Sequence, residues 1–193
     1  SAGSNGVDRC LTAHVALNSD VFLEHEHLFR STAGRWAVLF DAAHLAGPFL
    51  LVDLHRLAAM RPAQAPREQI SAGFVDFSPS DAKLFVASPA GELWIYAASG
   101  AQGAFELQAR RPAAAIPAAA VRPGDGEVLT SLHAIDETRI VLARSDGVLV
   151  ALDTDTLEEQ WRIRLSATGR VRRTVVSPNR QFLVAVGEAG SQL

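Results

Sequence analysis

One pattern, an apolar run followed by a turn and a second apolar run, recurs along this chain. Repetition of this kind constrains the fold more strongly than any other feature of the sequence. The pattern is clearest in residues 73–97, where Ser78-Pro79-Ser80-Asp81 forms the first turn and a third apolar run follows the second turn. The same layout appears in residues 27–54 and 128–153, and it begins again at residue 171. The chain is therefore expected to be an array of similar supersecondary units.

The period of the repeat can be measured at the start of each second apolar run. The matched residues are Trp36, Leu84, Ile140 and Phe182, which are 48, 56 and 42 residues apart. Four-stranded units in repeat arrays need roughly 40–45 residues, so each repeat has room for four strands. The long middle interval contains residues 111–123, a Pro- and Ala-rich stretch without a strand pattern. We interpret this stretch as an insertion between two units.

Short strands are expected in every repeat, because Val, Ile, Leu and Phe fill the apolar runs and turn-forming residues fill the gaps. Second runs such as residues 182–186 are apolar throughout, which is typical of strands buried on both faces. Residues 161–165 alternate, so their apolar side chains should face a neighbouring sheet while Arg162 and Arg164 face water. The expected strands are 10–17, 21–30, 35–40, 49–54, 57–60, 72–77, 83–88, 92–97, 105–109, 127–133, 139–144, 148–153, 159–165, 171–176 and 181–186.

These segments resemble the blades of β-propellers. Residues 77–81 followed by 91–96 resemble a WD-repeat blade. Residues 147–156 are similar to blades of pyrroloquinoline-quinone-type propellers, and residues 177–184 resemble the bacterial lactonase type. The resemblance implies an all-β propeller with about three four-stranded blades and partial blades at both ends. It implies one partial domain over residues 1–193, with blades at 20–62, 70–110, 126–166 and 170–193 and the tail of a preceding blade at 1–19.

Composition narrows the class of protein. The net charge of −3 predicts no global attraction to nucleic acid or to a membrane. A transmembrane helix needs about 20 apolar residues, and no apolar run in this sequence is that long. Cys10 is the only cysteine, which excludes a disulfide framework within the chain. The basic residues are almost all arginine, with Lys83 as the single lysine, a bias that suggests a GC-rich bacterial genome.

The sequence is expected to contain a partial repeat at each end. Residues 10–17 already alternate like a strand, and the chain stops where the last repeat calls for a third strand. We therefore expect an incomplete ring from a longer protein, because a propeller blade packs on both of its neighbours. Nothing near Ser1 resembles a signal peptide, which favours the cytoplasm.

The most ligand-like cluster is Glu24-His25-Glu26-His27. On a strand His25 and His27 point to the same face, so both imidazoles could reach one metal ion. No third ligand stands at a known metal-site spacing, and a solvated strand edge explains the same residues. The prediction is therefore no metal site and no cofactor, with His25 and His27 as the weak alternative.

A second cluster is basic. Residues 161–180 contain six arginines and no carboxylate, which makes a local positive patch in a chain of negative net charge. The interpretation that strand alternation favours is the outward face of two edge strands, where positive charge discourages aggregation, and the alternative is a surface that binds an acidic partner or a phosphate. No aromatic side chains interleave with the arginines, so nucleic acid is an unfavoured partner. The predicted partner-binding residues are Arg162, Arg164, Arg170, Arg172 and Arg173.

No catalytic motif appears in the sequence: there is no Gly-x-Ser-x-Gly elbow, no His-Glu-x-x-His and no phosphate-binding glycine loop. The predicted function is a non-catalytic interaction module that binds a protein partner through its face loops at 61–67 and 111–123. The alternative is part of a propeller enzyme, either a periplasmic oxidoreductase subunit or a lactonase-like hydrolase. Its strongest visible candidates would be His25, His27, Asp53 and His55.

Overall fold

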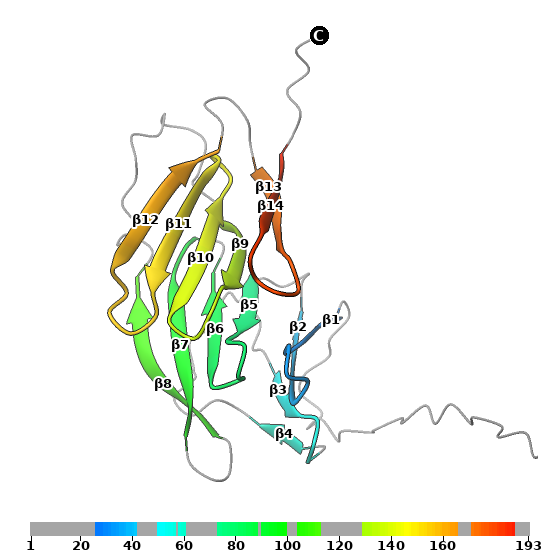
Figure 1. The fold of residues 1–193 in the computed structure, drawn as a ribbon. Helices are drawn as coiled ribbons and strands as arrows, with labels where there is room; N and C mark the ends of the chain where they lie inside the picture. The colour runs from blue at the N-terminus through cyan, green and yellow to red at the C-terminus, as the bar shows by residue number, and fades with distance from the viewer. Residues whose placement is uncertain are drawn as a thin grey trace, which may run out of the picture.

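All regular secondary structure in the described part of the chain is β-strand, so the expected all-β class is confirmed (Figure 1). The computed structural model describes residues 26–41, 50–56, 58–60, 73–88, 90–99, 104–112, 129–165 and 171–187. None of these residues belongs to a helix long and apolar enough to cross a membrane. The strands are β1 (Glu26–Arg30), β2 (Trp36–Asp41), β3 (Leu50–Asp53), β4 (Ala58–Met60), β5 (Phe74–Phe77), β6 (Lys83–Ala87), β7 (Leu93–Ser99), β8 (Ala104–Arg111), β9 (Leu129–Ala134), β10 (Arg139–Arg144), β11 (Val148–Asp153), β12 (Glu159–Arg164), β13 (Val171–Val176) and β14 (Leu183–Gly187).

The strands form four antiparallel sheets, and the strand order in each sheet follows the chain. Sheet 1 comprises β1–β4, sheet 2 comprises β5–β8, sheet 3 comprises β9–β12, and sheet 4 is the hairpin β13–β14. Each sheet is therefore a meander built from local turns. The predicted strands correspond to these elements, with shifts of a few residues at their ends, apart from the predicted strand at 10–17, which lies outside the described residues.

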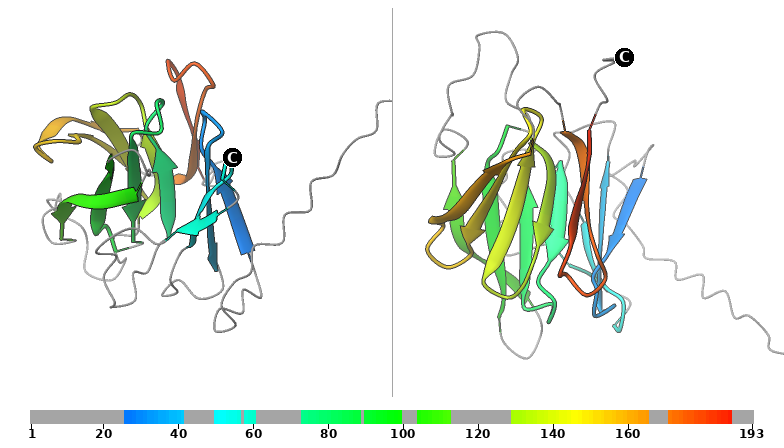
Figure 2. Two further views of the ribbon diagram at one scale, coloured as in Figure 1. Left: turned by 90° about the horizontal axis from the view of Figure 1, so that it is seen from below. Right: turned by 45° about the horizontal axis from the view of Figure 1, so that its top comes forward.

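The sheets pack face to face (Figure 2). An apolar core joins sheets 1 and 2, in which Trp36 meets Phe105 edge-on with ring centroids 5.1 Å apart, and Phe29 stacks with Phe77 at 6.2 Å. A second core joins the other face of sheet 2 to sheet 3. A third, smaller core lies on the far face of sheet 3, and Leu183 of sheet 4 packs against it. Burial of both faces explains why the second strands of sheets 2 and 3 are almost continuously apolar.

The same turn closes the first hairpin of sheets 1, 2 and 4. Its first residue is Ser31, Ser78 or Ser177, and the serine Oγ accepts a hydrogen bond from the backbone N–H five residues later at 3.0–3.1 Å. The fourth residue of each turn has a positive φ: 81° at Gly34, 62° at Asp81 and 57° at Arg180. This conformation normally favours glycine, which sheet 1 has at this position as Gly34. In sheets 2 and 4 Asp81 and Arg180 adopt the same conformation.

Two expectations about burial were wrong, and both concern sheet 4 and its neighbour. The second strand of sheet 4 was expected to be buried on both faces, but Phe182, Val184 and Val186 are 67%, 60% and 52% exposed. Trp161 and Ile163 were expected to face a covering sheet, but they are 37% and 49% exposed. Both exposures have one cause, because sheet 4 has two strands where the others have four, and it covers only part of sheet 3.

Candidate functional site

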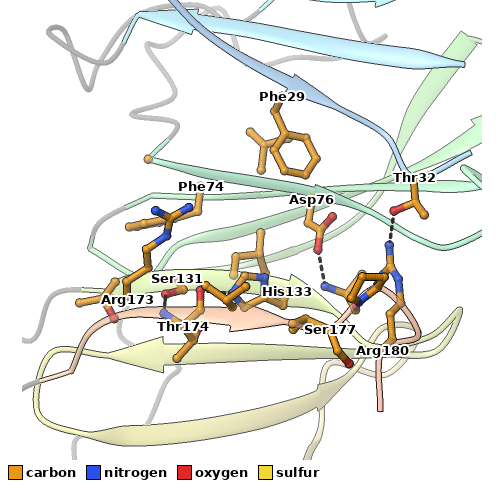
Figure 3. A pocket seen from close by; sticks show the side chains of 18 of the residues that line it. Phe29, Thr32, Phe74, Asp76, Ser131, His133, Arg173, Thr174, Ser177 and Arg180 are labelled. Atoms are coloured by element: carbon orange, nitrogen blue, oxygen red, sulfur yellow. Dashed lines mark hydrogen bonds between the residues drawn. The ribbon is translucent and has the colours of Figure 1, made fainter. Parts of the chain in front are cut away.

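The first strands of the four sheets converge on a cavity of about 570 Å³ (Figure 3). Its described lining comes from β5, β9 and β13, from Phe29 on β1, and from the turns after β1 and β13. The described sheets do not close into a ring, and the cavity is open to solvent. Residues far apart in the sequence meet in this cavity.

Asp76 joins sheet 2 to sheet 3 at the wall of this cavity. Its Oδ2 accepts a hydrogen bond of 2.8 Å from the backbone N–H of Ala134 on β9, and its Oδ1 accepts one of 2.7 Å from its neighbour Phe77. The Asp76 side chain is 9% exposed. The first strand of a sheet has a free edge, and this carboxylate satisfies a donor on the free edge of β9.

Ser131 and His133 join sheet 3 to sheet 4 in the same way. The Oγ of Ser131 accepts a 2.8 Å hydrogen bond from the backbone N–H of Thr174, and Nε2 of His133 lies 3.0 Å from the Thr174 carbonyl oxygen. Since a carbonyl only accepts, this contact makes Nε2 the protonated ring nitrogen. Both backbone groups of Thr174 on the free edge of β13 are therefore bound by side chains of the preceding sheet.

Arg180 links all four sheets. From its turn in sheet 4, Nη1 donates to the carbonyl oxygen of Ala134 in sheet 3, and both Nη atoms lie 3.4–3.5 Å from the carbonyl of Phe77 in sheet 2. Nη2 also donates a 2.7 Å hydrogen bond to Oγ1 of Thr32 in sheet 1. Arg180 therefore lies at one end of the cavity as a bridge between segments up to 148 residues apart.

Burial shifts the pKa values of both titratable groups in the middle of the cavity. Desolvation raises the pKa of Asp76 to about 6, although the N–H groups of Ala134 and Phe77 and the charge of Arg180 act against the rise. Desolvation lowers the pKa of His133, and the charges of Arg173 and Arg180 lower it further, against the hydrogen bond to Thr174. At neutral pH Asp76 is therefore ionised and His133 is neutral.

One polar atom in the lining is unsatisfied. Thr174 is 1% exposed, and its Oγ1 has no hydrogen-bond partner among the described residues. A buried hydroxyl without a partner costs free energy relative to an apolar group of the same shape.

Replacement of Thr174 by valine is therefore expected to raise the free energy of unfolding by up to about 1 kcal/mol, in contrast to most core substitutions. Urea denaturation followed by circular dichroism measures the change. Ser131→Ala is the matched control, because it removes a hydroxyl that does accept a hydrogen bond from Thr174, and it should lower stability by about 1 kcal/mol. A loss of stability in Thr174→Val as large as in Ser131→Ala would show that the hydroxyl has a partner.

The predicted basic patch is divided between two elements. Arg162 and Arg164 lie on β12, the strand of sheet 3 farthest from β9, whereas Arg172 and Arg173 lie on β13, which packs beside β9. The Nη2 of Arg162 lies 2.6 Å from the Glu159 carboxylate, and that of Arg164 lies 3.8 Å from Asp146. Arg172 and Arg173 are exposed and line the cavity. Arg170 lies outside the described residues.

The other predicted residues are not gathered into one site. His25 and both predicted contact loops fall outside the described residues, apart from positions 111–112 of the second loop, and His27 lies on β1 with its side chain undescribed. Asp53 accepts hydrogen bonds from the backbone N–H groups of His55 and Arg56 and from the guanidinium of Arg35. These bonds outweigh burial and lower the pKa of Asp53, so its role is to hold a turn. The described residues contain no group of three potential ligands able to hold a metal ion.

Comparisons with known proteins add no identification. No protein-family model matches the chain, and no curated protein sequence matches it. The function of the protein is therefore inferred from the geometry of the sheets and of the cavity.

Proposed function

We propose that the four sheets are consecutive blades of a β-propeller. Sequential meanders, face-to-face packing through three apolar cores, and first strands that surround one cavity are the features that support this architecture. The matched turns at Ser31, Ser78 and Ser177 indicate that sheets 1, 2 and 4 are copies of one unit.

In a propeller, two further strands beside β14 would complete sheet 4. By analogy with sheets 2 and 3, such strands would lie over Trp161, Ile163 and Leu165, whose apolar row continues the core between sheets 3 and 4. The outward face of β14, with Val184, would meet the next blade. Large apolar patches on a soluble protein usually mark surfaces that another element covers.

Val184→Lys is expected to reduce self-association of the 193-residue chain while changing its free energy of unfolding by less than about 0.5 kcal/mol. Leu183→Lys is the matched control on the opposite face of β14, where the side chain packs against sheet 3, and it should cost about 1–2 kcal/mol. Sedimentation velocity and urea denaturation measure the two effects. Equal destabilisation by the two substitutions would contradict the assignment of an uncovered face to Val184.

We infer that this propeller is a non-catalytic module that binds a protein partner. The observation that supports it is the use of Asp76, Ser131, His133 and Arg180, because each of these polar residues around the cavity holds one sheet to another. Such bonds favour a rigid support whose loops and exposed strands make the contacts. The exposed arginines of β13 are the described residues best placed to meet an acidic partner.

Affinity capture with chemical cross-linking tests this proposal. The wild-type chain, an Arg172→Glu/Arg173→Glu variant and an Arg162→Glu/Arg164→Glu variant are immobilised and exposed to a bacterial lysate at low salt. The β13 variant should lose a partner that the wild type and the β12 variant retain, because the β12 arginines lie close to Glu159 and Asp146. A partner retained equally by all three proteins would remove β13 from the binding surface.

The enzyme alternative has one observation in its favour: the cavity draws on four sheets, as a site at a propeller axis should. The chemistry of the described lining does not favour it, because both oxygens of Asp76 and Nε2 of His133 are engaged by backbone groups. Turnover of lactones or quinone-coupled substrates that disappears in Asp76→Asn but persists in Ser131→Ala would support the enzyme instead.

A further inference from the structure

The described lining of the cavity has an excess of positive charge. It contains Arg172, Arg173 and Arg180 against a single carboxylate, Asp76, which is already bound to two backbone N–H groups. His133 is neutral at neutral pH and adds no charge to the lining. Even with Asp76 ionised, the lining keeps a net positive charge, and a concave surface of low dielectric concentrates such a field on an anion.

Arg173 is the guanidinium in this lining that is positioned for a ligand. Arg180 is held by Thr32, Phe77 and Ala134, and Arg172 has an interaction of its own, whereas Arg173 has no hydrogen bond or ion pair with any of the described residues. Figure 3 shows Arg173 and Arg180 toward opposite ends of the lining, with Asp76 and His133 between them. The effect of Arg173 on the pKa of His133 indicates that its charge acts in the interior of the cavity.

The walls of the cavity also select for an apolar body. Phe29, Phe74, Val75 and Leu132 contribute to the lining, and the volume of about 570 Å³ is in the range of small-molecule sites. A planar guanidinium matches a carboxylate through two parallel hydrogen bonds. A guanidinium also pairs with phosphate in this way, but a phosphate ion has no apolar body to lie against Phe29 and Phe74.

We propose that the cavity binds a small organic carboxylate with a flat apolar body, with its carboxylate on Arg173 and its body against Phe29 and Phe74. This binding site goes beyond the protein-partner function and does not depend on it. It requires only the described cavity, and it is tested with small molecules and purified protein.

The test uses 2-naphthoate, its uncharged analogue 2-naphthamide and inorganic phosphate as probes of the 193-residue chain. Binding is followed by titration calorimetry and by chemical shifts of backbone amides in β5, β9, β13 and β14 at low salt. We expect 2-naphthoate to bind at least about tenfold more tightly than either other probe, because only it supplies both the charge and the apolar body. Arg173→Gln should weaken naphthoate binding about tenfold or more, while Arg164→Gln leaves it unchanged.

Folding does not confound the comparison, because Arg173 is exposed and has no described partner, and the melting temperature of each variant is measured beside its affinity. Phe74→Leu provides a second variant, which should weaken naphthoate and leave phosphate unaffected. Equal binding of naphthamide, unchanged affinity in Arg173→Gln, or shifts confined to β14 would each overturn the proposal. The last result would indicate adsorption to the exposed face of Val184.

Discussion

Replacement of Arg180 by alanine is expected to lower the free energy of unfolding by about 3 kcal/mol. The guanidinium donates to the carbonyls of Ala134 and Phe77 and to the hydroxyl of Thr32, and removal of a charged donor leaves partly buried acceptors unpaired. The loss should also loosen sheet 4, which otherwise contacts sheet 3 through Thr174 and Leu183. Urea denaturation measures the first effect, and hydrogen exchange of β13 and β14 amides measures the second.

Two variants at the same position separate the side chain from the backbone. Position 180 has a φ of 57°, which alanine tolerates poorly and glycine adopts freely, so Arg180→Gly should be about 1 kcal/mol more stable than Arg180→Ala. Arg180→Lys keeps the charge but cannot reach several acceptors at once, and its stability should lie between those of the wild type and Arg180→Gly. Arg139→Ala, which removes an exposed ion pair with Asp136, should cost less than about 1 kcal/mol. A cost in Arg180→Ala no larger than in Arg139→Ala would contradict the bridging role.

The sequence was sufficient to predict the sheets, for a physical reason. The period of the repeat and the turns at Ser78 and Ser177 depend on local interactions, which are visible in a short window of residues. The burial of β6 and β10 followed from their continuous apolar runs. The apolar run of β14 predicted burial as well, but this strand is exposed. Exposure depends on which strands lie next to it and not on its own side chains.

The residues around the cavity could not be selected in the same way. Arg180 belongs to an arginine-rich stretch, and its place at the end of the Ser177 turn does not indicate which residues its side chain contacts. Its role depends on contacts with residues 46, 103 and 148 positions away. Asp76 offered one signal, a carboxylate in the middle of an apolar first strand, since a buried carboxylate normally has hydrogen-bond partners.

Asp76 and Arg180 both line the cavity, and their effects should be coupled. The charge of Arg180 lowers the pKa of Asp76 against the effect of burial. No described strand pairs with the free edges of the first strands, so side chains connect adjacent sheets there. The same burial that lets Arg180 bridge the sheets also shifts the pKa of Asp76.

The stability of the protein is expected to fall as Asp76 ionises. Its pKa is about 6 in the folded protein against 3.8 for a fully solvated aspartate, so the folded state binds the proton more tightly than the unfolded state. The resulting stabilisation is fully present below about pH 3.8 and is lost as the pH rises through about 6. Each pKa unit corresponds to about 1.4 kcal/mol, so the total change is about 3 kcal/mol.

Asp76→Asn isolates this contribution, because the amide does not titrate in this range. Between pH 4 and pH 7 the stability of the wild type relative to Asp76→Asn should decrease by about 2 kcal/mol, most of the total change, as measured by urea denaturation. Asp136→Asn is a control of opposite sign. Hydrogen bonds from Arg139 and Thr138 outweigh the burial of Asp136 and lower its pKa, so its stabilisation is present above the unfolded pKa and is lost as the pH falls.

A carbon-detected NMR titration of the Asp76 carboxyl provides a direct measurement, with a midpoint expected near pH 6. The midpoint should move upward in Arg180→Ala, because removal of a nearby positive charge favours the protonated carboxyl, and it should move less in Arg180→Lys. A wild-type midpoint at or below pH 4 would mean that the N–H groups of Ala134 and Phe77 outweigh the cost of burying this carboxylate. The ionised group would then stabilise the junction of sheets 2 and 3, and the stability of the wild type relative to Asp76→Asn would no longer fall between pH 4 and pH 7.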